Sequence, residues 1–542
     1  MSTAYGNFLT AVSFRTPVAS NGRMSPREEP IVNPWLIAVS VMLATFMEVI
    51  DTSIASVALP HIAGSLSATT DEATWVLTSY LVANAIVLPA SGWFSLRFGR
   101  KRFLLTCIVI FTISSFMCGA ATSLAAILIA RAVQGAGGGA LQPLAQSILL
   151  ESFPPEKRGA AMAMYGLGVV VAPVLGPTLG GWLTDQYSWR WAFYINIPIG
   201  ALALFMISRF VNDPPYIKNA KPGRIDGIGL GLLAVWLGAL QMILDKGQED
   251  DWFGAIWIRW ATVILLGAFF AFIVRELKAE KPLVNLQIFR DRNFAIGTVL
   301  IGLFGGVIYG VVTLLPLFYQ TLLGYTAQAA GWAVSPRGVG AICIMPIIGV
   351  LTGRIDNRWL IVGGFAIFGA TSLWMANLTL EISPLSLLWP IILSGVGSGM
   401  VFVPLSTISV GTLRNEQIGN ASGLFNLMRN VGGGIGISLV NTLVARHSQV
   451  HRAELAQNLA PQNPAFRQAF QSSERLMSQF VSPNVAAQRA YGLIQGTLDA
   501  QSAAFAYVDV FRFLAMACFG CAVVVFGMKR VRSRKGAASV AH

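Results

Sequence analysis

Charged side chains are scarce in this sequence. Asp, Glu, Lys and Arg make up 12% of its 542 residues, whereas hydrophobic residues make up 54%. A soluble globular protein carries about 25% charged residues. The composition therefore excludes an ordinary soluble protein and predicts an all-α polytopic membrane protein.

Residues suited to catalysis, metal binding and nucleotide binding are also few. The four histidines form no metal-type or triad cluster in the sequence, and the five cysteines all lie in apolar runs. Cys518 and Cys521 have redox spacing, but inside an apolar segment we interpret them as packing residues. No Gly-Lys-Ser/Thr sequence follows a glycine-rich loop, so an ATP site is not expected. We predict no enzyme, no metal and no cofactor, and expect an ion gradient to drive any transport.

Long apolar runs predict fourteen membrane-spanning helices. A run of about 20 apolar residues crosses a hydrocarbon core of about 30 Å as a helix. The predicted spans are residues 35–59, 74–95, 103–122, 124–149, 160–184, 191–210, 225–244, 254–274, 293–319, 328–353, 359–377, 385–410, 417–445 and 509–528.

Basic residues gather on one side of these spans. When residues 1–34 are taken as cytoplasmic, only Arg190 and Lys246 fall in the short loops of the opposite side. Loops rich in Lys and Arg face the cytoplasm, so both termini are predicted to be cytoplasmic. The net charge of +13 is then explained by contact with anionic lipid, and nucleic acid is not expected as a partner.

A faint internal duplication organises the spans. Residues 92–102 and 349–358 are both glycine-bearing, basic connections, eight spans apart. Two repeats with a site at their interface are common in secondary transporters. The predicted parts are a cytoplasmic tail (1–34), a six-helix bundle (35–210), two inserted helices (225–274), a second six-helix bundle (293–528) and a basic cytoplasmic tail (529–542).

The second bundle contains one long connection, residues 446–508, on the outer side. It holds Pro461, Pro464 and Pro483 and apolar residues at mixed helical spacing. We expect short amphipathic helices outside the membrane. Connections in compact proteins are usually about 4–6 residues, so this length favours a partner or a lid over a plain connector.

Two acids, Glu48 and Asp51, lie within the first predicted span. They are three positions apart and therefore share one helix face. A charged residue near the middle of a spanning helix costs roughly 2.5–3.5 kcal/mol, and such residues usually have a function. We predict a proton-binding site here; the alternative is hydrogen bonding within a helix bundle.

Helix rise indicates a partner for one of these acids. At 1.5 Å per residue, Asp51 lies about 12 Å below the outer end of the first span, and Arg131 lies about 10 Å below the same face in the fourth. An arginine favours the charged carboxylate, while burial favours the neutral one. A carboxyl group on which these two opposing effects act together can bind and release protons. The alternative is a purely structural ion pair.

Polar residues inside other spans mark a candidate substrate cavity between the two bundles. Arg337 and Arg429 cannot lie unpaired in lipid, so they are candidates to bind an anionic group, to pair with Glu48 or to line a wet cavity. For the remaining candidates an interhelical hydrogen bond is the alternative. These are Asn84, Gln142, Gln146, Tyr309, Tyr319 and Asn426.

The fifth span combines prolines with a stripe of small residues. Pro173 and Pro177 remove backbone donors and kink a helix. Small residues at four-residue spacing allow a neighbouring helix to approach closely. The stripe consists of Gly168, Ala172, Gly176 and Gly180, and Gly181 follows its last member. We expect a bent, tightly packed helix on which a rocking transporter can pivot.

Several of these segments together resemble the major facilitator superfamily, and within it the fourteen-span drug:proton antiporters. The residues that carry the resemblance are the second-to-third loop Gly92 to Arg102 (including Arg97, Gly99 and Arg100), Arg131 to Gly135, Gly168 to Gly181, Ile50 to Pro60, Asn196 to Gly200 and Leu244 to Trp252. The resemblance covers about Pro34 to Met528. It implies the major facilitator fold, with two six-helix bundles and two inserted helices.

The resemblance also implies roles and partners. Asp51 would be the coupling acid and Arg131 would assist proton transfer. A periplasmic adaptor and an outer-membrane channel would be partners, in contact with residues 446–508. Leu96 stands where the loop motif usually has an acid, which leaves the charge relay of that loop open, and Glu48 lies outside the motif.

Together these observations predict proton-coupled export of hydrophobic or amphipathic compounds across a bacterial inner membrane by alternating access. An exporter of one endogenous metabolite, fatty acid or lipid would have the same fold. A non-transporting sensor or scaffold is a further alternative, and Na⁺ remains open as the coupling ion. An enzyme acting on membrane lipids is disfavoured because no nucleophile, base or metal set converges.

Overall fold

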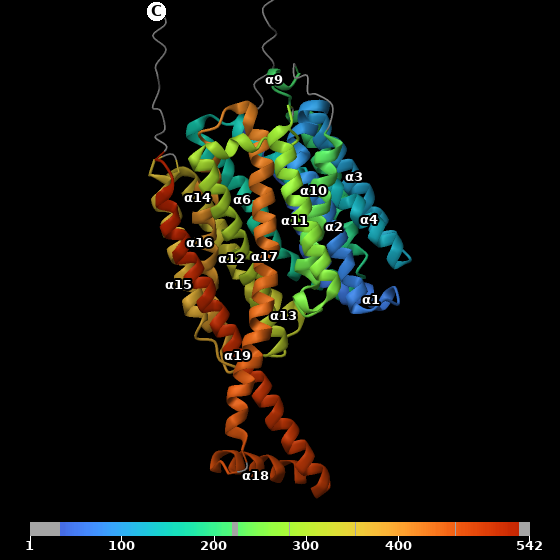
Figure 1. The fold of residues 1–542 in the computed structure, drawn as a ribbon, viewed down its shortest axis with the longest axis vertical. Coiled ribbons are helices and arrows are strands. Elements are labelled where there is room, and N and C mark those ends of the chain that lie inside the picture. The colour runs from blue at the N-terminus through green and yellow to red at the C-terminus, as the bar shows by residue number, and fades with distance from the viewer. Residues whose placement is uncertain (1–32, 219–225, 281, 353, 461, 531–542) are drawn as a thin grey trace, which may run out of the picture.

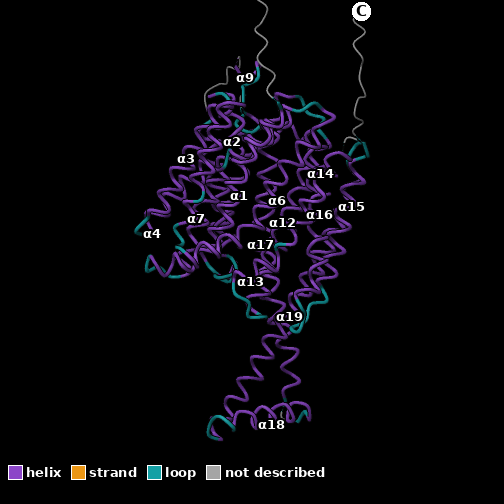
Figure 2. Tube along the Cα trace, turned by 180° about the vertical axis from the view of Figure 1, so that it is seen from behind, coloured by secondary structure: helices purple, strands orange, loops and turns teal. Residues whose placement is uncertain are grey.

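The computed structural model describes residues 33–218, 226–280, 282–352, 354–460 and 462–530, and all regular elements in these ranges are helical (Figures 1 and 2). The prediction of an all-α protein is therefore confirmed. The helices of the first half of the chain are α1 Pro34–Ser65, α2 Thr70–Phe98, α3 Arg100–Ala120, α4 Leu124–Gly138, α5 Leu141–Ser152, α6 Arg158–Gln186, α7 Trp191–Tyr194, α8 Asn196–Phe210, α9 Pro215–Lys218, α10 Gly227–Lys246 and α11 Ile256–Lys278.

The second half of the chain continues in the same way. Its helices are α12 Arg292–Thr321, α13 Ala327–Val334, α14 Pro336–Leu351, α15 Asn357–Met375, α16 Pro384–Val410, α17 Asn415–Ala456, α18 Pro464–Ser478 and α19 Pro483–Val524. Short 3₁₀ turns lie at Pro155–Lys157, Trp252–Gly254, Leu286–Arg290, Gln457–Leu459 and Val525–Gly527.

Thirteen helices among the described residues are long and apolar enough to span a membrane. The one predicted span without a counterpart among these thirteen, 417–445, corresponds to α17, which runs through the centre of the bundle beside the others (Figure 1). Asn420, Asn426, Arg429, Asn430 and Asn441 make this helix less apolar than its neighbours. Its polar side chains face other helices rather than lipid, as its buried Asn426 and Arg429 show.

Some predicted spans consist of two helices in sequence. The fourth is α4 followed by α5, the sixth is α7 followed by α8, and the tenth is α13 followed by α14. At the break between α4 and α5, a side chain on Gly139 would overlap the backbone of Asn84 in α2. This glycine of the fourth span therefore serves close helix packing.

The spanning helices form two groups that meet along a central line. Within the first group α1 packs on α6 and α8, and α2 and α3 pack on α4; within the second, α12 packs on α17, and α16 packs on α14 and α15. Contacts between the groups run from α6 to α14 and from α2 to α17. Helices α10 and α11 pack on each other and reach the bundle through α2 and α17. The residue boundaries of the predicted parts remain a prediction.

The two groups are in backbone contact at the end of the bundle where α1 begins, which we call the basic end. A Cβ on Gly92 would lie 3.3 Å from the backbone of Asn420 in α17, and one on Gly349 would lie 3.1 Å from the carbonyl oxygen of Gly159 in α6. Each glycine belongs to one of the two duplicated connections. The pseudo-symmetric glycines therefore let the backbones of the two groups touch at this end.

The opposite end carries a projection that we call the stalk, residues 446–508. The last turns of α17 and the first turns of α19 leave the bundle together, and α18 crosses their far ends (Figures 1 and 2). The expectation of short helices holds for α18 alone. It is wrong for the flanking segments, because α17 and α19 continue unbroken from the bundle into the stalk, each over 42 residues.

Candidate functional site

Asp51 is fully enclosed and accepts hydrogen bonds at both oxygens. Its Oδ2 is 2.6 Å from Arg131 Nη1, and neither side chain is exposed. Its Oδ1 accepts from Gln134 Nε2 at 2.8 Å and from Asn196 Nδ2 at 2.7 Å. The pair expected from helix depth is thus present. All three partners belong to the first helix group, on α4 and α8.

Two of the three guanidinium nitrogens of Arg131 donate hydrogen bonds, and Nη2 is buried without a partner among the described residues. Its Nε donates to the Val76 carbonyl oxygen at 3.0 Å and its Nη1 also reaches Gln134 Oε1 at 2.8 Å. The guanidinium carbon lies 4.2 Å from the centre of the Tyr80 ring, a favourable cation–π arrangement. A buried ion pair needs such additional hydrogen bonds to offset the loss of hydration.

Sequence reasoning did not predict Gln134 or Asn196 as partners of Asp51. Gln134 lies three positions after Arg131 and so shares its helix face, a signal that was present in the sequence. Asn196 is on α8, far from both residues in sequence, and only the fold brings it to Asp51.

Glu48 has different partners. Its Oε1 accepts from Asn84 Nδ2 at 3.1 Å and from the Tyr80 hydroxyl at 3.3 Å, and its Oε2 accepts from Gln142 Nε2. All three donors are neutral side chains. The predicted cavity residues Asn84 and Gln142 are therefore direct partners of Glu48.

The contacts of Glu48 continue into the second helix group. Gln142 Oε1 accepts from Arg429 Nη2 of α17. One turn along the same two helices, Asn426 Nδ2 donates to Gln146 Oε1 at 2.6 Å. Asn426 also accepts from the hydroxyl of Tyr165 in α6 at 3.2 Å. We call this connected set, comprising Glu48, Asn84, Gln142, Gln146, Tyr165, Asn426 and Arg429, the polar seam.

Some hydrogen-bond donors of the polar seam have no acceptor among the described residues. Within the described part of the chain, Arg429 Nε and Nη1 and Gln146 Nε2 are buried without a partner. A buried donor without an acceptor costs about 1–3 kcal/mol. Acceptor atoms of a ligand or of water would satisfy these donors, so the seam is equipped to bind a polar group.

Three predicted cavity residues lie elsewhere. Tyr309 packs on Gly433 of α17, one turn beyond Arg429. Tyr319 is buried with its ring stacked 5.3 Å from that of Tyr325. Arg337 donates to Ser394 at 3.2 Å inside the second group, and it lines a separate pocket with Pro173 and Pro177 of α6.

Tyr165 is a member of the seam that sequence reasoning missed. It is a single hydroxyl in the apolar run of the fifth span. A tyrosine at such a position usually signals core packing, and its contact with Asn426 depends on the second helix group lying against α6.

Three glycines of α6 face α1 at positions before and after Asp51. A side chain on Gly176 would overlap Ser53, one on Gly168 would meet Met42 at 3.2 Å, and one on Gly180 would meet Ile54 at 3.2 Å. Gly181 differs, because it faces Gln328 of α13 at 3.8 Å. Pro177 cannot donate to the Pro173 carbonyl four residues earlier, and the Ser53 hydroxyl donates to that oxygen at 3.1 Å instead.

The loop between α2 and α3 is fixed by carboxylates from other segments. Arg100 makes two hydrogen bonds to Glu151 of α5, at 2.9 and 3.0 Å, and donates to the Tyr216 hydroxyl at 2.7 Å. Asp213 accepts from the Lys101 backbone N–H at 2.7 Å. Gly99 adopts a φ of 83° at this turn, which favours glycine. Arg97 is exposed.

One cluster corrects an expectation about metals. His447, His451 and Asp509 lie at the base of the stalk with ligand atoms all within 4.8 Å of one another. The prediction that no metal-type cluster exists is wrong for the described residues. Asp509 is more than fifty positions from the histidines and meets them only because α19 packs on α17.

With the geometry described, the chain can be compared with known proteins. The Major Facilitator Superfamily profile matches residues 41–437. This chain belongs to that superfamily. The family predicted from the sequence motifs is confirmed, and the chain is a multi-pass membrane transporter rather than an enzyme.

Curated relatives match nearly the whole chain. The fatty acid resistance protein FarB of Neisseria gonorrhoeae is 38% identical over 465 residues, covering 86% of this chain and 90% of FarB. The multidrug export protein EmrB of Escherichia coli K12 is 36% identical over 489 residues, covering 90% of this chain and 94% of EmrB. The resemblance of the sequence motifs to EmrB is thereby confirmed.

Solved structures support the fold alone. The crystal structure of the human organic anion transporter MFSD10 superposes with a TM-score of 0.56 at 14% identity, covering 90% of this chain and 99% of that one. The proton:xylose symporter XylE gives a TM-score of 0.53 at 15% identity, covering 89% and 94%.

Proposed function

We propose that this transporter exports hydrophobic or amphipathic compounds in exchange for protons, by alternating access across a bacterial inner membrane with both termini in the cytoplasm. The observation that carries the proposal is the polar seam. It connects an acid of the first helix group, Glu48, to an arginine of the second group, Arg429, through one shared side chain, Gln142. A change in the hydrogen bonding of Glu48 or of Arg429 would therefore alter the contact between the two groups.

The partners of the two acids favour different roles. Protonating Asp51 would break its contact with Arg131 and leave a buried arginine unpaired, which costs several kcal/mol. Protonating Glu48 breaks no direct ion pair, because its three hydrogen-bond donors are neutral. We therefore assign proton exchange to Glu48 first, and keep the Asp51–Arg131 pair, the coupling site in the family resemblance, as the second candidate.

Proton uptake at Glu48 has a direct consequence for substrate. A neutral Glu48 would accept a weaker hydrogen bond from Gln142 Nε2, so the Gln142 side chain would be held less firmly. The other end of that side chain, Oε1, is the atom that accepts from Arg429. The free Nε and Nη1 donors of Arg429 are suited to a carboxylate, because charge-assisted hydrogen bonds are stronger than neutral ones. Proton binding at Glu48 and substrate binding at Arg429 would thus influence each other, because both residues contact Gln142.

An apolar groove offers a route for hydrophobic compounds. It lies between α6 of the first group and α13 and α14 of the second, and its lining includes Leu175, Trp182, Trp332 and Val339. The name of the relative FarB refers to fatty acid resistance. A compound with an acidic head and an apolar tail, or an endogenous fatty acid or lipid, would have a partner for its head in Arg429 and a partner for its tail in this groove, which Arg429 itself does not line.

The stalk is the proposed contact for a periplasmic adaptor, which would link the transporter to an outer-membrane channel. In support, α18 is a short helix with no buried residue. It lies across the end of the stalk, farthest from the bundle (Figure 2).

The test is export from proteoliposomes with pH and Na⁺ gradients varied independently, using wild type, Glu48→Gln and Asp51→Asn. We expect Glu48→Gln to lose export driven by a pH gradient but to retain substrate exchange without a gradient. Gradient-driven export that survives Glu48→Gln and is lost in Asp51→Asn would move the coupling to the Asp51–Arg131 pair. Export driven only by Na⁺ would refute proton coupling, and no flux of any compound would favour a sensor or scaffold.

A further inference from the structure

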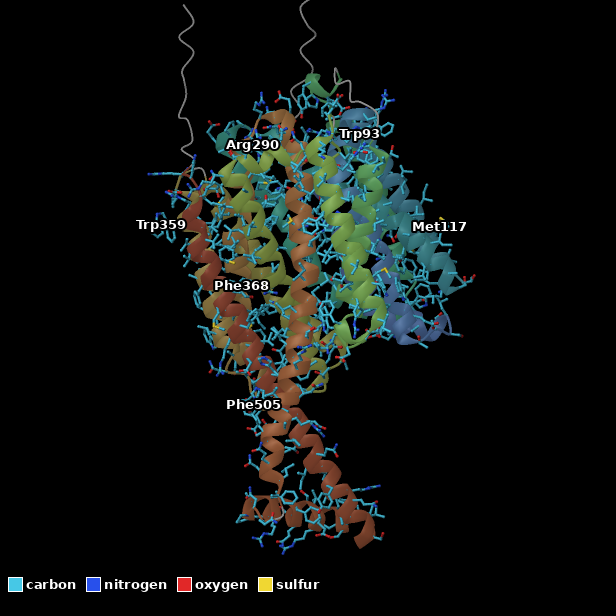
Figure 3. All side chains as sticks on the ribbon, viewed as in Figure 1. Trp93, Met117, Arg290, Trp359, Phe368 and Phe505 are labelled. Atoms are coloured by element: carbon cyan, nitrogen blue, oxygen red, sulfur yellow. The ribbon has the colours of Figure 1, made fainter. Side chains whose placement is uncertain are left out.

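Three side chains that bind metals meet at the base of the stalk. His447 and His451 lie one turn apart on α17, and Asp509 lies opposite them on α19. Figure 3 labels Phe505, one turn before Asp509, at the point where the two helices leave the bundle. The proposed transport reaction uses none of these residues.

The atoms face one another in a way that suits one small cation. Asp509 Oδ2 lies 2.7 Å from His451 Nε2 and 3.3 Å from His447 Nδ1. Ligands about 2.0–2.1 Å from a tetrahedral ion are separated by about 3.3 Å. A small adjustment of the side chains would bring all three atoms to binding distance.

The surroundings orient two of these ligands. His451 uses Nε2 toward Asp509, and its Nδ1 lies 3.5 Å from the Glu454 carboxylate. A carboxylate behind a metal-binding histidine is a common outer partner, because it fixes the ring and its tautomer. The other oxygen of Asp509 faces Arg512 at 3.4 Å, which leaves Oδ2 directed at the histidines.

We propose that His447, His451 and Asp509 form a binding site for a divalent transition-metal ion of the zinc class. Imidazole nitrogens with one carboxylate suit Zn²⁺ and Cu²⁺ and do not suit Ca²⁺ or Mg²⁺, which require mostly oxygen ligands. The three side chains are 24–42% exposed, so an ion can enter from solvent and water can complete its coordination.

The site joins two helices that otherwise separate into the stalk. A metal ion there ties the end of α17 to the base of α19, and α17 also carries Asn426 and Arg429 of the polar seam. The bound ion would therefore order the stalk relative to the bundle. Its binding does not depend on the transported compound.

The experiment is Zn²⁺ binding to the full chain in lipid nanodiscs, purified with a tag that contains no histidine, in competition with a chromophoric chelator. We expect about one tightly bound Zn²⁺ per chain. His447→Ala and His451→Ala should each weaken binding by at least tenfold, and Glu454→Gln by about tenfold, as for other outer partners. Asp509→Asn should also weaken it. The matched control is His61→Ala, which removes a histidine 3.9 Å from another aspartate, Asp185.

A second measurement, the absorption spectrum of bound Co²⁺, tests which residues bind the ion. Co²⁺ in place of Zn²⁺ should give the intense visible absorption of a four-coordinate ion with nitrogen ligands in wild type and in His61→Ala, and lose it in His447→Ala. Circular dichroism and size-exclusion profiles check that each variant is folded. The proposal is overturned if wild type binds Zn²⁺ no more tightly than the His447→Ala/His451→Ala double variant, or if His61→Ala loses binding equally.

Discussion

Arg429 shows at the residue scale how a buried side chain is prepared for a ligand. One of its nitrogens is engaged by Gln142 and Asn430, while Nε and Nη1 have no partner among the described residues. Arg131, equally buried, uses Nε and Nη1 within the first helix group and leaves Nη2 without a partner among the described residues. The two arginines thus differ in that Arg131 pairs directly with a carboxylate, whereas Arg429 has only neutral partners and two unused donor atoms.

This difference predicts a substrate-selective effect. Arg429→Met should raise KM for compounds with a carboxylate by about 10–100-fold, since a hydrogen bond to a charged group contributes about 1.5–3 kcal/mol. Export of neutral compounds should change much less. Arg429→Lys keeps the charge and should restore part of the affinity. Equal losses for acidic and neutral compounds in the liposome assay would contradict direct binding.

At the element scale, α1 and α6 act as one unit. Gly176 is the closest approach, and Ser53 of α1 satisfies the carbonyl that Pro177 leaves without its usual donor. The acid-bearing helix and the proline-bearing helix therefore move together. Any bending of α6 at its prolines is transmitted to the segment that holds Asp51.

Two glycines five positions apart test this packing. Gly176→Ala places a methyl group into Ser53 and should destabilise the protein by about 1–3 kcal/mol, as overpacking does. Gly181→Ala is the matched control, because its methyl group would lie 3.8 Å from Gln328 and meets no overlap. Thermal unfolding in detergent should show a lower Tm for Gly176→Ala alone; equal Tm values would contradict the tight contact.

The inserted helices are joined at the basic end by a charge pair. Asp226 at the start of α10 accepts from Arg275 of α11 at 3.0 Å, and hydrogen bonds from Arg275 hold the pKa of Asp226 below its usual value. A carboxyl with a lowered pKa adds stability above its unfolded-state pKa, about 3.9, and that stability is lost as pH falls through the folded-state value.

Asp226→Asn isolates the charge, because asparagine also caps helices well. The variant should melt below wild type at pH 7, and the difference should shrink as the pH is lowered from 5 toward 3. A difference in Tm that is constant over this pH range would assign the effect to the cap rather than to the ion pair.

At the scale of the whole molecule, apolar runs and basic loops were sufficient to predict the helical membrane fold, and motif residues predicted the family. The Asp51–Arg131 pair could be predicted because both residues lie at known depths in their own spans. The seam partners Asn426 and Tyr165 could not be paired, since their contact depends on how two distant helix groups meet. Helices were expected in the stalk, but the unbroken continuation of α17 and α19 into it was not, because the predicted spans were bounded where their apolar runs end.

Alternating access predicts that fixing the two groups together stops transport. A Cβ on Gly423 of α17 would lie 3.5 Å from Ser91 Oγ of α2, so cysteines at these two positions would bring their sulfur atoms within reach of each other. The Ser91→Cys/Gly423→Cys variant should stop exporting after mild oxidation and recover on reduction. Each single cysteine variant is the control. Full export by the oxidised, cross-linked protein would contradict opening at the basic end.

Helix α17 runs for 42 residues without a proline, from the basic end through Arg429 to the stalk. At 1.5 Å per residue, its tip at Ala456 lies about 40 Å from Arg429. The glycines just after Arg429 pack on the backbone of α12 at Gly432 and Gly436, which supports the helix there, and a tilt of about 5° of the whole helix at Arg429 displaces the tip by about 3.5 Å over that length. A partner docked on the stalk would therefore sense the occupancy of the seam as a mechanical displacement, without contacting the transported compound.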